Sequence, residues 1–122
     1  MNANYLWTTI TVKSIETSLS FYRDLLGLTV ERRFMPYPAL ELCFLTDGNG
    51  IQVELLEHKP ATDAVTAPAN LSLGFRVADL DEALNICKDR GIEIVNGPFE
   101  GAGVKFFFVK DPDGVNVQFV QK

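Results

Sequence analysis

The sequence predicts an α+β fold of two tandem βαβββ modules that form a curved mixed sheet around a shared cleft. The main observation is an internal repeat. Its first part pairs Val12, Ser14, Leu19 and Asp24 with Val77, Asp79, Leu84 and Asp89. Its second part pairs Phe44, Asp47 and Gly50 with Phe108, Asp111 and Gly114, at an offset that is changed by one residue deleted between Asp24 and Gly27. Two such copies are expected to face one another across a pseudo-two-fold axis and to enclose the site.

The chain of 122 residues is about as long as one small domain. We expect a single domain over residues 1–122, with module 1 at about 4–58, a linker at 59–70 and module 2 at about 71–122. The linker is predicted because this segment contains Pro60, Pro68 and several alanines, which suit a crossover connection.

The composition is typical of a soluble globular protein, with 47% hydrophobic and 22% charged residues. The net charge of −5 and the scattered Lys and Arg residues argue against a nucleic-acid or membrane partner. No apolar run approaches the ~20 residues of a membrane span, and residues 1–7 do not resemble a signal peptide, so we expect a cytoplasmic protein. Cys43 and Cys87 lie in apolar patterns and are predicted to be buried thiols.

In module 1, residues 5–12 alternate and are rich in Thr and Ile, which predicts a strand. Ser14 is the predicted N-cap of a helix that has apolar residues at helical spacing and ends at Gly27. Three further strands are predicted at residues 28–34, 40–46 and 51–57, the last two joined by a turn at 47–50.

Module 2 repeats this order, beginning with a predicted strand at residues 71–77. Asp79 is the expected N-cap of a helix that ends at Gly91. Three strands are then predicted at residues 92–95, 104–109 and 115–120.

The register of the 47–50 turn decides which side chains share a face of the sheet. If Thr46 pairs with Ile51, then Cys43 lies opposite Glu54, and the face with Phe44 and Val53 meets the helices. A shift by one residue would exchange the two faces. The other, more polar face is expected to line the cleft. Its candidate ligand-binding residues are Trp7, Thr9, Glu41, Gln52, Glu54, Ser72, Arg76, Lys105, Phe107, Asn116 and Gln118.

Two stretches of the chain resemble a known family. The first is Thr11-Val12-Lys13-Ser14-Ile15-Glu16-Thr17-Ser18-Leu19-Ser20-Phe21-Tyr22, followed by Leu25-Leu26-Gly27-Leu28. The second is Val77-Ala78-Asp79-Leu80-Asp81-Glu82-Ala83, followed by Gly91 and by Asp111-Pro112-Asp113-Gly114. They resemble the vicinal-oxygen-chelate family, which includes glyoxalase I, bleomycin-resistance proteins and extradiol dioxygenases. The resemblance covers nearly the whole chain and implies the fold more specifically than the activity.

The resemblance implies that enzymes of this family hold a divalent metal with one ligand from the first and one from the last strand of each module. By the repeat, these positions fall on Trp7, Glu54, Ser72 and Gln118. Only Glu54 is a good ligand, and a catalytic metal usually needs three protein ligands. We therefore expect no cofactor, and a divalent metal (Zn, Ni, Mn or Fe) only if the chain is a lyase. The single histidine, His58, is predicted to lie on the surface.

The lack of good ligands at three of the four implied metal positions favours a metal-free protein that binds or sequesters a small organic molecule, as the bleomycin-resistance type does. The resemblance also implies a homodimer. Trp7 either stacks on the ligand or fills the space of the lost metal. Glu54 is the one candidate catalytic residue, as a general base, but it could instead contact the ligand or pair with Arg76. Arg76 and Lys105 either pair with Glu54 and Glu41 or bind the ligand.

Two alternatives stay open at this point. The first is a glyoxalase-type lyase or isomerase, similar to lactoylglutathione lyase, with an atypical metal site. The second is a domain with a closed cleft that serves only as an interaction module.

Overall fold

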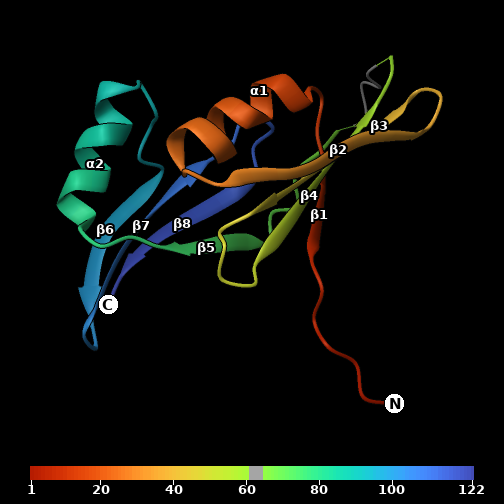
Figure 1. The fold of residues 1–122 in the computed structure, drawn as a ribbon. Coiled ribbons are helices and arrows are strands. Elements are labelled where there is room, and N and C mark those ends of the chain that lie inside the picture. Colours follow the sequence, from red (N-terminus) through yellow and green to blue (C-terminus); the bar gives the residue numbers. More distant parts are fainter. Residues whose placement is uncertain (61–64) are drawn as a thin grey trace. The chain divides into compact units, whose positions relative to one another are not determined.

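The computed structural model describes residues 1–60 and 65–122. They form two compact units, Met1–Val65 and Thr66–Lys122, which divide inside the predicted linker. Each unit contains one four-stranded mixed sheet and the same order of elements (Figure 1). The predicted α+β class with two βαβββ modules is confirmed. No helix in the described ranges is long and apolar enough to cross a membrane.

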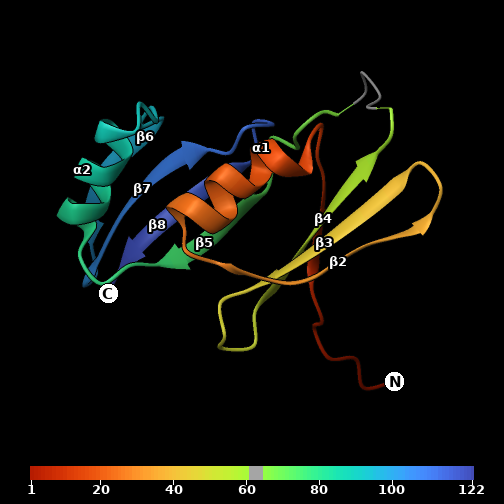
Figure 2. The same ribbon diagram turned by 45° about the horizontal axis from the view of Figure 1, so that its top comes forward.

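The first unit begins with β1 (Thr8–Thr11) and α1 (Ile15–Leu19), which continues as the π-helical segment η1 (Ser20–Leu25). Strands β2 (Thr29–Tyr37), β3 (Leu40–Thr46) and β4 (Gln52–His58) follow. The strand order is β1-β4-β3-β2, with β1 parallel to β4 and the other neighbours antiparallel (Figure 2).

The second unit contains β5 (Ser72–Arg76), α2 (Leu80–Asp89), β6 (Asn96–Gly101), β7 (Val104–Lys110) and β8 (Asn116–Gln121). Its strand order, β5-β8-β7-β6, repeats that of the first unit. The predicted strand at 92–95 is wrong. Gly91 has a φ of 71°, and the N–H of Ile92 bonds the carbonyl of Cys87 at 2.8 Å, so this segment terminates the helix.

The predicted helix caps are both present. The Ser14 hydroxyl accepts a hydrogen bond from the Thr17 N–H at 3.2 Å, and the Asp79 carboxylate accepts one from the Glu82 N–H at 3.1 Å. Each cap satisfies one of the backbone donors that a helix leaves unpaired at its start.

The one-residue difference between the two repeats lies in the first helix. In η1 the N–H of Leu26 bonds the carbonyl of Phe21 at 3.0 Å, a span one residue longer than in an α-helix. A π-helical turn of this kind holds one extra residue inside a helix. Both helices then end at a glycine with left-handed backbone, Gly27 (φ 81°) and Gly91 (φ 71°).

The turn after β3 is one residue longer than the sequence predicts. The carboxylate of Asp47 accepts hydrogen bonds from the N–H groups of Asn49 at 2.7 Å and of Ile51 at 3.2 Å. Ile51 therefore belongs to the turn, and Thr46 pairs with Gln52.

The second unit repeats this turn. The Asp111 carboxylate accepts hydrogen bonds from Asp113 N–H at 2.9 Å and Val115 N–H at 2.8 Å, and Lys110 pairs with Asn116. The repeated Asp and Gly positions are thus explained by two equivalent turns.

The longer turns reverse the faces predicted for β3 and β7 and leave those of β4 and β8 unchanged. One face of each sheet is buried. It holds Ile10, Cys43, Leu45, Val53 and Leu55 in the first unit and Phe107, Val109, Val117 and Phe119 in the second. Cys43 and Cys87 are buried free thiols, as predicted, and burial raises the pKa of both.

Each helix is fixed at its first residue by a side chain of the last strand. The N–H of Ile15 bonds the carboxylate of Glu57 at 2.6 Å, and the N–H of Leu80 bonds the amide oxygen of Gln121 at 2.7 Å. Both acceptors lie on the buried face by strand alternation, so each helix begins on that side of its sheet.

We predict that Glu57→Ala lowers the free energy of unfolding by about 2 kcal/mol and Gln121→Ala by about 1 kcal/mol, because hydrogen bonds to charged groups are stronger than neutral ones. The positive end of the helix adds to the effect of the Glu57 carboxylate. Urea denaturation of the two variants at neutral pH measures both values. Equal losses in the two variants would contradict the assigned role of the charge.

Candidate functional site

The open face of the first sheet carries four of the predicted site residues: Trp7, Thr9, Gln52 and Glu54. Thr9 of β1 and Phe44 of β3 are the strand partners of Glu54 on its two sides. The Trp7 indole meets the Phe44 ring edge-on, with ring centroids 5.1 Å apart. We call Trp7, Thr9, Arg32, Phe34, Phe44 and Glu54 the tryptophan face.

Aromatic rings and one cation extend this face across β3 and β2. Phe34 and Phe44 are stacked at a centroid distance of 6.4 Å, and the Arg32 guanidinium lies 4.6 Å from the centre of the Phe34 ring. Phe44 is 6% exposed, whereas Trp7 is 38% exposed. The face therefore has a packed aromatic base and an indole that is accessible to a flat molecule.

Glu54 is a buried carboxylate at the centre of this face, only 8% exposed. The Thr9 hydroxyl donates a hydrogen bond to Oε1 of Glu54 at 2.5 Å. This is the one hydrogen bond of the Glu54 side chain within residues 1–60 and 65–122, so the carboxylate is held in place and keeps accepting capacity.

Gln52 lies on the same strand face as Glu54, but at its exposed rim. Its amide donates a hydrogen bond to the carboxylate of Glu31 at 2.6 Å. Glu31 has no strand partner on β3, because the register of β2 shifts between Val30 and Arg32. This irregularity turns an additional acidic side chain toward the rim of the face.

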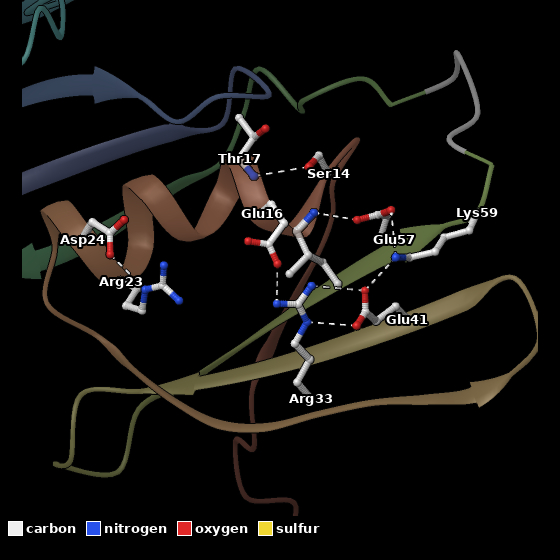
Figure 3. A network of polar contacts seen from close by, with 10 residues as sticks. Ser14, Glu16, Thr17, Arg23, Asp24, Arg33, Glu41, Glu57 and Lys59 are labelled. Carbon is white, nitrogen blue, oxygen red and sulfur yellow. Dashed lines mark hydrogen bonds and ion pairs between the residues drawn. The ribbon is translucent and has the colours of Figure 1, made fainter.

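Glu41 does not share the face of Glu54, contrary to the prediction, because the longer turn reverses β3. It lies at the buried face, where Arg33 Nε and Lys59 Nζ each approach its carboxylate at 2.9 Å. Arg33 also contacts Glu16 of α1 at 2.6 Å, so the ion pairs join the helix to β2, β3 and the end of β4 (Figure 3). Glu41 is a structural residue of the first unit.

In the second unit, Ser72, Arg76, Asn116 and Gln118 lie on the open face, as predicted. Lys105 and Phe107 do not, because the β7 register places them on the face with Phe119, and Phe107 is 0% exposed. Phe107 is buried between two partly exposed neighbours, Phe106 and Phe108.

A cavity of about 320 Å³ lies on the open face of the second sheet, the face that carries Ser72 and Asn116. Its lining residues are Ala69, Asn70, Leu71, Ser72, Val95, Asn96, Phe108 and Asn116. Only Ser72 and Asn116 belong to the predicted set. Asn96 and Phe108 were missed because the strand that begins at Asn96 was predicted to begin four residues earlier and β7 was assigned to the wrong face.

The side chains present do not fit a catalytic divalent metal. Glu54 is hydrogen-bonded to Thr9, and its other neighbours on the face include indole and phenyl rings, which have no lone pair to donate. The equivalent strand positions of the second unit hold a hydroxyl and a neutral amide, Ser72 and Gln118. Within the described ranges, no three His, Cys, Asp or Glu residues are grouped to hold a metal ion. His58 is exposed at the end of β4, as predicted.

Comparison with known proteins identifies the family. The model of the Glyoxalase/Bleomycin resistance protein/Dioxygenase superfamily matches residues 4–119. The chain belongs to this superfamily.

Two relatives within this superfamily are lactoylglutathione lyases. The protein from Neisseria meningitidis is 31% identical, and the match covers 96% of this chain and 89% of the relative. The protein from Haemophilus influenzae is 27% identical over 95% of this chain and 90% of the relative.

A solved structure from the same superfamily confirms the fold. The glyoxalase family protein from Bacillus cereus matches with a TM-score of 0.83 and 21% identity, over 99% of this chain and 95% of that one. The likeness extends over both βαβββ modules.

We predict that Glu41 makes the stability of the protein depend on pH. Arg33 and then Lys59 hold the pKa of Glu41 below its ordinary value of 4.5. Because the folded-state pKa is lower than the unfolded one, this stabilisation is present above about pH 4.5 and is lost as the pH falls through the folded pKa. The free energy of unfolding should therefore fall more steeply in the wild type than in Glu41→Gln.

Urea denaturation from about pH 6 to about pH 3 measures the two slopes. The exposed Glu93, changed to Gln, is the matched control and should leave the slope unchanged. If Glu41→Gln and Glu93→Gln gave the same pH dependence, the role of the ion pairs would be contradicted.

Proposed function

We propose that this superfamily member is a metal-free protein that binds or sequesters a small organic molecule, held against the tryptophan face. The observation that carries the proposal is that the accessible Trp7 indole and the buried, oriented Glu54 carboxylate share one face, on which both are linked through Phe44. Trp7 stands at a position where the family resemblance implies a metal ligand, and its ring offers a flat contact surface in place of a lone pair.

The groups on this face favour a flat molecule with a cationic or hydrogen-bond-donating substituent. Glu54 forms no ion pair with any residue of 1–60 and 65–122, so a donor on the ligand would satisfy its second oxygen. Arg32 is already stacked on Phe34 and extends the aromatic platform for the ligand. The net charge of −5 also attracts cations over longer distances.

The second candidate function is that of a glyoxalase-type lyase or isomerase. The 31% identity to the lactoylglutathione lyase of Neisseria meningitidis, over nearly the whole chain, favours it. Such an enzyme would need a Lewis-acidic metal, and the four positions at Trp7, Glu54, Ser72 and Gln118 supply a single carboxylate. This activity would therefore require ligands other than the four that the resemblance implies.

We further propose a homodimer that acts in the cytoplasm without nucleic-acid or membrane partners. The acidic charge and the scattered cations support the absence of polyanionic partners. The homodimer is argued from family resemblance, and light scattering of the purified protein measures it.

Metal content separates the two candidate functions. Elemental analysis of the native protein, with Ni²⁺ and Zn²⁺ titrations of wild type and Glu54→Ala, should find no stoichiometric metal and no binding that depends on Glu54. Stoichiometric metal that is lost in Glu54→Ala would overturn the proposal and support a lyase.

Ligand binding can be read from fluorescence, because Trp7 is the single tryptophan of the chain. We predict saturable quenching by N-methylacridinium, a planar cation, and about tenfold weaker binding to Glu54→Gln, since the ionic contact between the ring cation and the carboxylate is lost. The exposed Glu93→Gln is the control and should bind as the wild type does. Absence of saturable quenching by planar compounds of either charge would contradict the proposal.

A further inference from the structure

We infer a site of spontaneous modification at the peptide bond between Asn49 and Gly50, in the turn that joins β3 and β4. At this site the side-chain amide of Asn49 is converted into a carboxylate by reaction with the backbone nitrogen of Gly50. The inference goes beyond the proposed function, because it uses no residue of the tryptophan face and none of the four positions implied for a metal.

The reaction needs only two groups of the turn and water. The nitrogen of Gly50 bonds to the side-chain carbonyl carbon of Asn49, while the bond from this carbon to the side-chain nitrogen breaks. The proton of the Gly50 nitrogen passes through solvent to the departing nitrogen, which leaves as ammonia. The product is a five-membered succinimide ring, and water opens it at either of its two carbonyl carbons. One opening gives aspartate at position 49, and the other gives isoaspartate, in which the main chain runs through the side chain.

Both reacting groups are accessible in the folded protein. Asn49 and Gly50 are exposed, at the end of the hairpin of β3 and β4 (Figure 2). The Asn49 side chain and the Gly50 N–H make no hydrogen bond to any residue that the structure describes. Gly50 has a φ of 94°, and, its two chain neighbours aside, no described atom lies within 4 Å of the place of a Cβ. Ring closure is therefore opposed neither by a hydrogen bond nor by a neighbouring side chain.

Asp47 fixes the turn without protecting the Gly50 nitrogen. Its carboxylate accepts the N–H groups of Asn49 at 2.7 Å and of Ile51 at 3.2 Å, one on each side of Gly50. The Gly50 N–H between them has no such acceptor, so base in the solvent can remove its proton. The reaction should therefore become faster as the pH rises.

The second Asn-Gly pair of the chain, Asn96-Gly97, is held in a paired strand. Asn96 is the first residue of β6 and pairs with Phe108 of β7. A Cβ at Gly97 would lie 3.1 Å from the Phe106 carbonyl oxygen, so the backbone is closely packed there. Ring closure needs a rotation of the backbone at the asparagine, and in β6 this rotation would break the strand pairing. The fold therefore distinguishes two identical dipeptides and exposes the one in the turn.

Isoaspartate at position 49 would loosen the turn that fixes the register of β3. It adds one carbon atom to the main chain between the two N–H groups that Asp47 holds. Its new carboxylate is also two residues from that of Asp47, and like charges repel. The modified chain should therefore unfold at a lower urea concentration than the unmodified chain. The modification acts as a slow, irreversible loss of stability in the first unit.

Incubation of the purified full chain at neutral and at mildly alkaline pH tests the inference. Peptide mapping by mass spectrometry should find a gain of one mass unit at Asn49, faster at the higher pH, with both aspartate and isoaspartate as products. The peptide with Asn96 should react at least about tenfold more slowly, because β6 must open first. In urea that unfolds the chain, the two peptides should react at similar rates.

Asn49→Gln is the test variant, because its longer side chain would have to close a six-membered ring, which is much slower. During incubation it should keep its urea midpoint, while that of the wild type falls. Asn85→Gln, at an exposed position of α2 that is followed by the branched Ile86, is the matched control and should behave as the wild type. Equal rates at Asn49 and Asn96 in the folded chain, or no modification of Asn49 before unfolding, would overturn the inference. An equal fall of the midpoint in the wild type and in Asn49→Gln would contradict the effect on the turn.

Discussion

The hydrogen bonds from the turn aspartates to the backbone determine the side-chain arrangement of both sheets. Asp47 and Asp111 each accept two N–H groups and thereby hold five residues in the turn. Because side chains alternate along a strand, this count decides that Glu54 lies beside Phe44 and that Cys43 faces the core. A turn shorter by one residue would bring core residues to the open face.

The two units use the same anchors with different chemistry. Each helix starts at a side chain of the last strand, a carboxylate from Glu57 in one unit and a neutral amide from Gln121 in the other. The first unit surrounds its anchor with the ion pairs of Arg33, Glu41 and Lys59 (Figure 3). The first unit also holds one extra residue in a π-helical turn of its helix. The two copies of the repeat therefore differ in length by one residue but keep equivalent hydrogen bonds at their helix starts and turns.

The open faces of the two sheets have diverged more than the framework that supports them. The first presents aromatic rings, Arg32 and the buried Glu54, and the second presents neutral amides and Phe108. Membership of the superfamily describes the framework, whereas the chemistry depends on these few positions of the open faces. The four positions implied for the metal supply one carboxylate, and the proposed binding of an organic molecule rests on this.

The sequence by itself determined the repeat, the superfamily fold, the caps at Ser14 and Asp79, and the burial of both thiols. These features depend on local hydrogen bonding and on hydrophobic pattern, which are visible in a linear chain. Tertiary structure decided the faces of Glu41, Lys105 and Phe107, because side-chain bonds of Asp47 and Asp111 to backbone amides lengthen the turns by one residue. It also decided the cavity at Asn96, since only strand pairing brings Asn96, Phe108 and Asn116 to one sheet edge.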